Sequence, residues 1–104
     1  MILNMLKEAL VAVSEKTYHF HAPANEEPDY IVWAEDGSND LIADNKHVEY
    51  GTTGTVDLYT LQEDSPLFQQ IQEALNGIPC IWYLNDVQYE EDTKLIHYEW
   101  VFEV

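Results

Sequence analysis

The chain has 104 residues, of which 20 are Asp or Glu and 4 are Lys or Arg, so its formal net charge is −16. A hydrophobic share of 46% supplies one core at this length, which excludes a disordered chain and predicts one domain over residues 1–104. The only strong cations are Lys7, Lys16, Lys46 and Lys94, because arginine is absent. Phosphates and anionic lipids are bound mainly by lysine and arginine, so the composition argues against tight nucleic-acid binding, membrane binding and phosphate chemistry. Two interpretations of the acidity remain open. It either keeps the protein soluble, or it forms a surface that repels polyanions or binds a basic partner.

Cysteine usage and the N-terminus indicate the compartment. Cys80 is the single cysteine and lies in an apolar run, which predicts a buried, inert thiol and excludes an internal disulfide. The apolar N-terminal stretch is interrupted by Lys7 and Glu8, so it is neither a signal peptide nor a membrane span. We expect a soluble protein made in a reducing cytoplasm.

The first half of the chain predicts one helix followed by short strands. Apolar residues recur every three or four positions over the first fifteen residues, as in an amphipathic helix. Alternating residues 17–22 and the β-branched and aromatic residues 30–33 predict two strands. Residues 34–45 are polar and predict a loop, with a short strand at 47–50 and a turn at 51–54.

The second half predicts a strand, a helix and further strands. Residues 55–60 alternate, with Val56, Leu58 and Thr60 on one face. Asp64 or Ser65 caps a helix of about residues 65–76, which has Pro66 at its first position and ends at Asn76-Gly77. The apolar run 79–84 predicts a central strand buried on both faces, followed by a bend at 85–86. Unbroken alternation over 95–104 predicts the last strand.

The order of these elements determines the fold class. Strands cluster between and after the two helices instead of alternating with them. We therefore predict an α+β fold, a mostly antiparallel sheet with both helices packed on one face.

Candidate catalytic and metal-binding groups are sparse. His19 and His21 share one face of a strand but lack further ligands, and the run 90–92 lacks the spacing of a calcium loop. His97 and Glu99 share a face and are candidates for an acid–base pair with Tyr59 or Ser65, but the sequence supplies no oxyanion hole or phosphate loop. We expect no catalytic, cofactor-binding or metal-binding residues and no enzymatic activity.

The aromatic residues leave two interpretations open. Tyrosine and tryptophan occur in nearly every predicted strand, which is more than one helix-covered sheet face can bury. They form either a protein interface or cross-strand pairs on a partly wet face.

Several segments resemble the small tail-completion proteins of long-tailed phages and prophages. The likeness spans most of the chain and comprises residues 28–37, 43–45, 54–60, 65–75, 89–92 and 96–100. This resemblance implies a tail terminator, an α+β protein that forms a hexameric ring, caps the tail tube and provides the surface for joining the head. It implies self-association, a tail tube protein and a head–tail connector protein as partners, and a place in the virion tail after assembly in the host bacterial cytoplasm. It transfers no catalytic residues.

The charge and the resemblance lead to the same expectation. DNA passes through a terminator ring, and a lumen lined with carboxylates would not retain it. Glu35, Asp36, Asp40 and Asp44 are the candidates for this lining or for contacts with neighbouring subunits. Because negative subunits repel one another, we expect a monomer at low ionic strength and a ring when salt, cations or the tube are present.

Two other functions remain as alternatives. A small acidic DNA-mimic or inhibitor protein would occupy a basic partner, but it needs its acids in one stripe, whereas here they are spread along the chain. A small metal- or ligand-binding enzyme is the third alternative.

Overall fold

The computed structural model describes residues 2–38 and 51–104, which form two helices and a five-stranded sheet. The elements are, in chain order, α1 (Ile2–Val13), β1 (Thr17–His19), β2 (Tyr30–Ser38), β3 (Thr52–Thr60), α2 (Pro66–Asn76), β4 (Ile81–Tyr89) and β5 (Ile96–Glu103). The strand order is β1-β2-β3-β5-β4, and only the β1–β2 pair is parallel. The predicted α+β class and mostly antiparallel sheet are confirmed.

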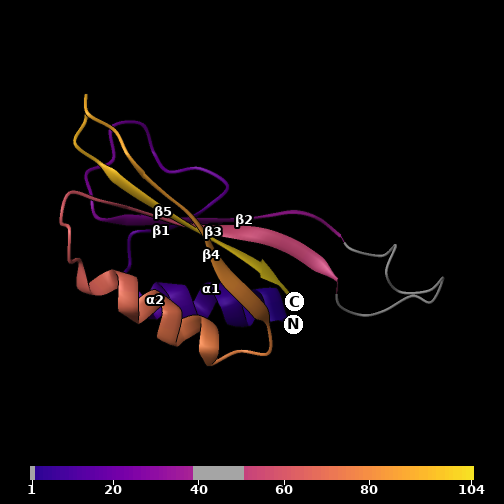
Figure 1. Ribbon diagram of the computed structural model, residues 1–104. Helices are drawn as coiled ribbons and strands as arrows, with labels where there is room; N and C mark the ends of the chain where they lie inside the picture. The colour runs from indigo at the N-terminus through magenta and orange to yellow at the C-terminus, as the bar shows by residue number, and fades with distance from the viewer. Residues whose placement is uncertain (1, 39–50) are drawn as a thin grey trace.

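Both helices cover the same face of the sheet (Figure 1). The core between them and the sheet consists of fully buried or nearly fully buried apolar side chains from both helices and from β2, β3 and β5: Leu6, Leu10, Ile31, Trp33, Val56, Leu58, Ile71, Leu75, Trp100 and Phe102, with Val104 after β5. Within residues 2–38 and 51–104, no helix covers the opposite face. This one-sided packing explains why buried and more exposed residues alternate along β3 and β5, since every second side chain points into the core.

The predicted helix caps are present. Ser65 is the N-cap of α2, where its Oγ accepts a hydrogen bond from the backbone N–H of Leu67 at 3.3 Å, and Pro66 opens the helix. Ser65 Oγ also donates to Asp29 Oδ2 at 2.9 Å, which fixes the segment before β2 to the start of α2. Gly77 ends the helix as its C-cap. This part of the sequence folds as its local signals predict.

Two predictions around the β2–β3 pair were wrong. The start of the predicted loop 34–45 belongs to β2, which continues to Ser38, and the predicted turn 51–54 lies mostly in β3. Gly54 lies within β3, at a position that has no room for a side chain. A Cβ there would lie 2.2 Å from the carbonyl oxygen of Ala34 and 2.5 Å from Cζ of Phe102. The glycine therefore marks close packing of two strands and not a turn. The predicted strand at 47–50 and residues 39–45 of the predicted loop lie outside the described residues.

The predicted central strand at 79–84 was also wrong. This segment contributes to β4, which is the edge strand beside β5, and most of its residues are exposed. The predicted bend at 85–86 is a register shift between Leu84 and Asp86, through which the strand continues to Tyr89. An apolar run looks the same in sequence whether its strand is buried or exposed at an edge. The predicted strand 17–22 is shorter than expected and ends at His19.

Candidate interaction surfaces

Two of the four predicted acidic site residues lie together at one end of the β2–β3 pair. Glu35 Oε1 is 2.6 Å from Nε2 of His19, and Asp36 Oδ1 accepts a hydrogen bond from Thr53 Oγ1 at 2.8 Å. The hydrogen bond with His19 is the main cause that holds the pKa of Glu35 below its ordinary value. Both carboxylates thus have partners within the chain. The other two candidates, Asp40 and Asp44, lie outside the described residues.

The two neighbouring histidines do not form a metal site with other residues of the described chain. His19 stacks on Trp33 with ring centroids 3.9 Å apart, whereas His21 Nδ1 lies 3.4 Å from the backbone oxygen of Ala22. Within residues 2–38 and 51–104, no three His, Cys, Asp or Glu side chains gather to hold a metal ion. In the run 90–92, Glu90 accepts a hydrogen bond from Thr93 Oγ1 at 2.8 Å.

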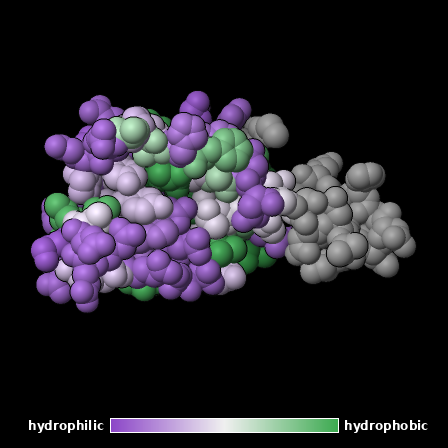
Figure 2. Space-filling model, turned by 90° about the horizontal axis from the view of Figure 1, so that it is seen from above, coloured by the Kyte–Doolittle hydropathy of each residue, from purple (hydrophilic) through white to green (hydrophobic). Residues whose placement is uncertain are grey.

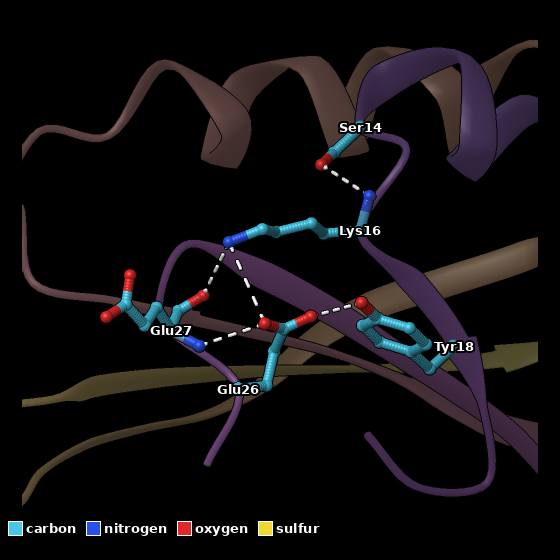
Figure 3. A network of polar contacts seen from close by, with 5 residues as sticks. All are labelled: Ser14, Lys16, Tyr18, Glu26 and Glu27. Atoms are coloured by element: carbon cyan, nitrogen blue, oxygen red, sulfur yellow. Dashed lines mark hydrogen bonds and ion pairs between the residues drawn. The ribbon is translucent and has the colours of Figure 1, made fainter. Parts of the chain in front are cut away.

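A polar network fixes the β1 edge to the segment before β2 (Figure 3). Lys16 Nζ donates to the backbone oxygen of Glu27 at 3.1 Å and lies 3.8 Å from Glu26 Oε1. Tyr18 donates its hydroxyl proton to the other carboxylate oxygen of Glu26. This hydrogen bond is the main cause that lowers the pKa of Glu26 and raises the pKa of Tyr18. The lysine and the histidine at this edge therefore each have a carboxylate beside them.

The open face of the sheet carries an aromatic stack at its centre. The rings of Tyr30 and Tyr59 are 4.8 Å apart, and the rings of Tyr59 and His97 are 4.4 Å apart. His97 Nε2 lies 2.7 Å from Asp57 Oδ1. The hydrogen bond with Asp57 raises the pKa of His97 despite partial burial, and burial raises the pKa of Tyr59 to about 12.

The stack contains two of the four residues that the sequence suggested as an acid–base group. His97 and Tyr59 do come together, but Glu99 accepts a hydrogen bond from Asn85 at 2.8 Å, and Ser65 serves as a helix cap. The partner of His97 is Asp57, which the sequence analysis missed because the pairing depends on the β3–β5 register. The strand alternation puts both residues on the open face, but only the register makes them neighbours.

The open face as a whole is mostly hydrophilic. Figure 2 shows the molecule from above, on the side away from the helices, where hydrophilic side chains predominate and smaller hydrophobic areas lie near the middle and at the edges. Acidic side chains occur here and also on the helices, as Asp57, Glu99, Glu8 and Glu73 illustrate. The negative charge therefore surrounds the molecule and does not form one stripe.

The edge strand β4 is the most exposed apolar element among the described residues. The exposed fractions are 73% for Ile81, 55% for Tyr83, 51% for Val87 and 58% for Tyr89. The register shift after Leu84 turns Ile81 and Tyr83 to the open face and Val87 and Tyr89 to the helix side. Exposed apolar groups on both faces of an edge strand are typical of a site for another strand.

A surface hollow adjoins the far end of this strand. It is lined by Leu61, Glu63, Val87, Tyr89, Lys94, Ile96 and Tyr98. Most of its lining is apolar, so it enlarges the apolar area beside β4. It lacks the set of converging polar groups that a small-molecule site uses for orientation.

Comparisons with known proteins do not identify a family. No model of a known protein family matches the chain, and no curated protein matches its sequence. Neither described helix has the length and hydrophobicity needed to cross a membrane.

Proposed function

We propose that the chain is a structural subunit of a phage or prophage tail, a tail terminator that assembles as a ring on the tail tube and joins the tail to the head. The observation that carries this proposal is a nine-residue edge strand with exposed apolar side chains on a body of net charge −16. Such an edge favours association with protein, whereas the charge disfavours association with DNA.

The charge suits a ring through which DNA passes. With 20 carboxylates and no arginine, the surface has few groups that displace counterions from phosphates. Glu35 and Asp36 are the described candidates for the lumen, and Glu35 is ionised over a wide pH range because its pKa is lowered. A lumen with ionised carboxylates repels the DNA backbone and lets it slide.

The alternative of a DNA-mimic is not favoured by the surface. A mimic needs carboxylates spaced like phosphates along one face, whereas Glu8 and Glu73 lie on the helices and Asp57 and Glu99 lie on the opposite side of the sheet. Competition between this chain and DNA for a basic protein would support the mimic.

The proposal is tested with the tail tube subunit encoded in the same gene cluster. The two proteins are expressed together, and the products are imaged by electron microscopy. We expect tubes that stop growing and carry a ring at one end, and tubes of unrestricted length when the chain is omitted. Tubes of the same length with bare ends, or a cluster that encodes no tube subunit, would contradict the proposal.

A further inference from the structure

We propose that the β4 edge of one copy pairs antiparallel with the β1 edge of a second copy, so that the sheet continues from subunit to subunit. This inference rests on the self-association in the proposed function and names the surface that makes it.

The β4 edge lacks most of the features that keep an edge strand unpaired. Between Ile81 and Tyr89 the only charged residue is Asp86, and neither lysine nor proline interrupts the strand. The register shift after Leu84 is the single irregularity. Natural edges that remain unpaired are commonly protected by lysine, proline or short length. A long edge without this protection indicates a strand that is covered in the assembled state.

The charge distribution indicates which partner covers it. Residues 74–85 contain no charged side chain, although about one residue in five of the chain is acidic. A basic partner would be attracted by carboxylates at its site, and residues 81–85 in the first half of β4 offer none, whereas Asp86 lies in the second half and the acidic residues 90–92 follow the strand. A partner that is itself strongly negative needs contact areas where charge is absent or compensated. A second copy of this chain is such a partner.

The β1 edge is short, three residues from Thr17 to His19, and its polar side chains have partners within the chain. Lys16 lies 3.8 Å from Glu26 and compensates its charge, and His19 Nε2 lies 2.6 Å from Glu35 Oε1. Phe20 follows β1 directly and has an exposed fraction of 58%, which provides an apolar contact. The two ends of the sheet thus both carry exposed apolar side chains, within residues 81–84 of β4 and at Phe20 after β1.

The strand directions allow this pairing. β1 and β2 run one way, β3 runs the opposite way, β5 returns and β4 reverses again, so β4 is antiparallel to β1. A second copy in the same orientation therefore presents β1 antiparallel to β4, with its helices on the same side. Because two unlike edges meet, the contact repeats and is able to close into a ring.

The register across the sheet predicts which residues meet. Thr17 lies at the level of Val87, and His19 at the level of Leu84, through the paired residues of β2, β3 and β5. A second copy that enters at the same level brings its His19 opposite Leu84 on the helix side of the sheet, with Phe20 stacked on His19 at a ring-centroid distance of 4.1 Å. The pair of His19 and Leu84 is specific to the head-to-tail contact.

The first experiment introduces a charge into the β4 edge. Val87→Lys and Ile81→Lys are compared with Val11→Lys, which changes the net charge equally at an α1 position with an exposed fraction of 42%. Light scattering after gel filtration at an ionic strength of about 1 M measures association. We expect both edge variants to weaken the association constant about tenfold or more, and Val11→Lys to leave it within about twofold.

The outcomes separate this inference from the proposed function. Equal association of edge and control variants would overturn the β4 contact while leaving the ring proposal intact. A wild-type chain that stays monomeric at every ionic strength would overturn the inference. Association through β4 by a chain that never caps tubes would support the inference and contradict the tail function. Circular dichroism checks that each variant is folded.

The second experiment tests the pairing of unlike edges. In a Cys80→Ser background, a His19→Cys chain and a Leu84→Cys chain are mixed at high ionic strength and oxidised. We expect disulfide-linked dimers in the mixture and few in either chain alone. Efficient cross-linking of the Leu84→Cys chain to itself would show that two β4 edges pair with each other, and would overturn the head-to-tail arrangement.

Discussion

Replacing Gly54 with alanine inserts a methyl group where β3 packs against β2 and β5. The added Cβ would lie 2.2 Å from the carbonyl oxygen of Ala34, 2.5 Å from Cζ of Phe102 and 2.9 Å from Cα of Glu35. Two of these atoms are backbone, so the methyl group is accommodated only if the two strands move apart. Phe102 is almost fully buried in the core and has little space to withdraw.

The expected cost follows from these contacts. Overpacking of a filled core costs about 1–3 kcal/mol, and contacts with backbone place Gly54→Ala at the upper end of this range. The reduced entropy of the unfolded chain offsets about 0.4–1 kcal/mol. We therefore expect the free energy of unfolding to fall by about 2 kcal/mol or more. Urea denaturation followed by tryptophan fluorescence, at constant ionic strength, measures it.

Gly37→Ala is the matched control. Its added Cβ would have Thr53 Oγ1 at 3.7 Å as its nearest neighbour, which is an ordinary contact. We expect this variant to stay within about 0.5 kcal/mol of the wild type. If both variants unfold at the same urea concentration, the close packing of β3 against β2 and the explanation of Gly54 are wrong.

Three further predictions concern the cap and the open face. Ser65→Ala removes the α2 cap and the donor to Asp29, so we expect a loss of about 1–2 kcal/mol in urea denaturation, and an unchanged midpoint would contradict the cap. The hydrogen bond with Asp57 raises the pKa of His97 in the folded state. The stability that this hydrogen bond contributes is therefore complete below the ordinary histidine pKa of about 6.5, and it is lost as the pH rises through the folded-state pKa. The stability difference between the wild type and His97→Asn should therefore narrow on going from pH about 6 to pH about 9, and a difference that is constant or grows would refute this. In an absorbance titration, Tyr59→Phe should remove an ionisation near pH 12, whereas loss of a step near the ordinary tyrosine value would contradict the burial of this ring.

Local sequence signals correctly predicted two kinds of element: those marked by a cap within a few residues, and those with a long run of regular alternation. The alternation that ends at Val104 predicted β5. The Ser65-Pro66 pair predicted the start of α2. These signals depend on the backbone geometry of one element, so no tertiary information was needed.

The errors arose where the environment of a strand depends on its neighbours. The apolar segment before Asn85 has the composition of a central strand, but its place in the sheet is an edge. Gly54 has the sequence signature of a turn, but its reason is the approach of Ala34 and Phe102 from other strands. Neither fact is contained in a single segment.

The candidate surfaces were predictable only in part. The excess of acid and the surplus of aromatic residues are visible in the composition, and Glu35 was selected from the sequence. Its pairing with His19 depends on the parallel β1–β2 register, and the Asp57–His97 pair depends on the β3–β5 register. The exposed β4 edge became visible only once the strand order was known.

The most direct test of the account is the mass of the wild-type particle as a function of ionic strength, measured by sedimentation velocity. At about 0.01 M the Debye length is about 30 Å, so the charge of −16 keeps copies apart, and we expect a monomer of 12.1 kDa. At about 1 M the Debye length falls to about 3 Å, and we expect the β4 edge to associate copies into a larger closed particle. A stable assembly at the lowest ionic strength, or a monomer throughout the series, would contradict the account.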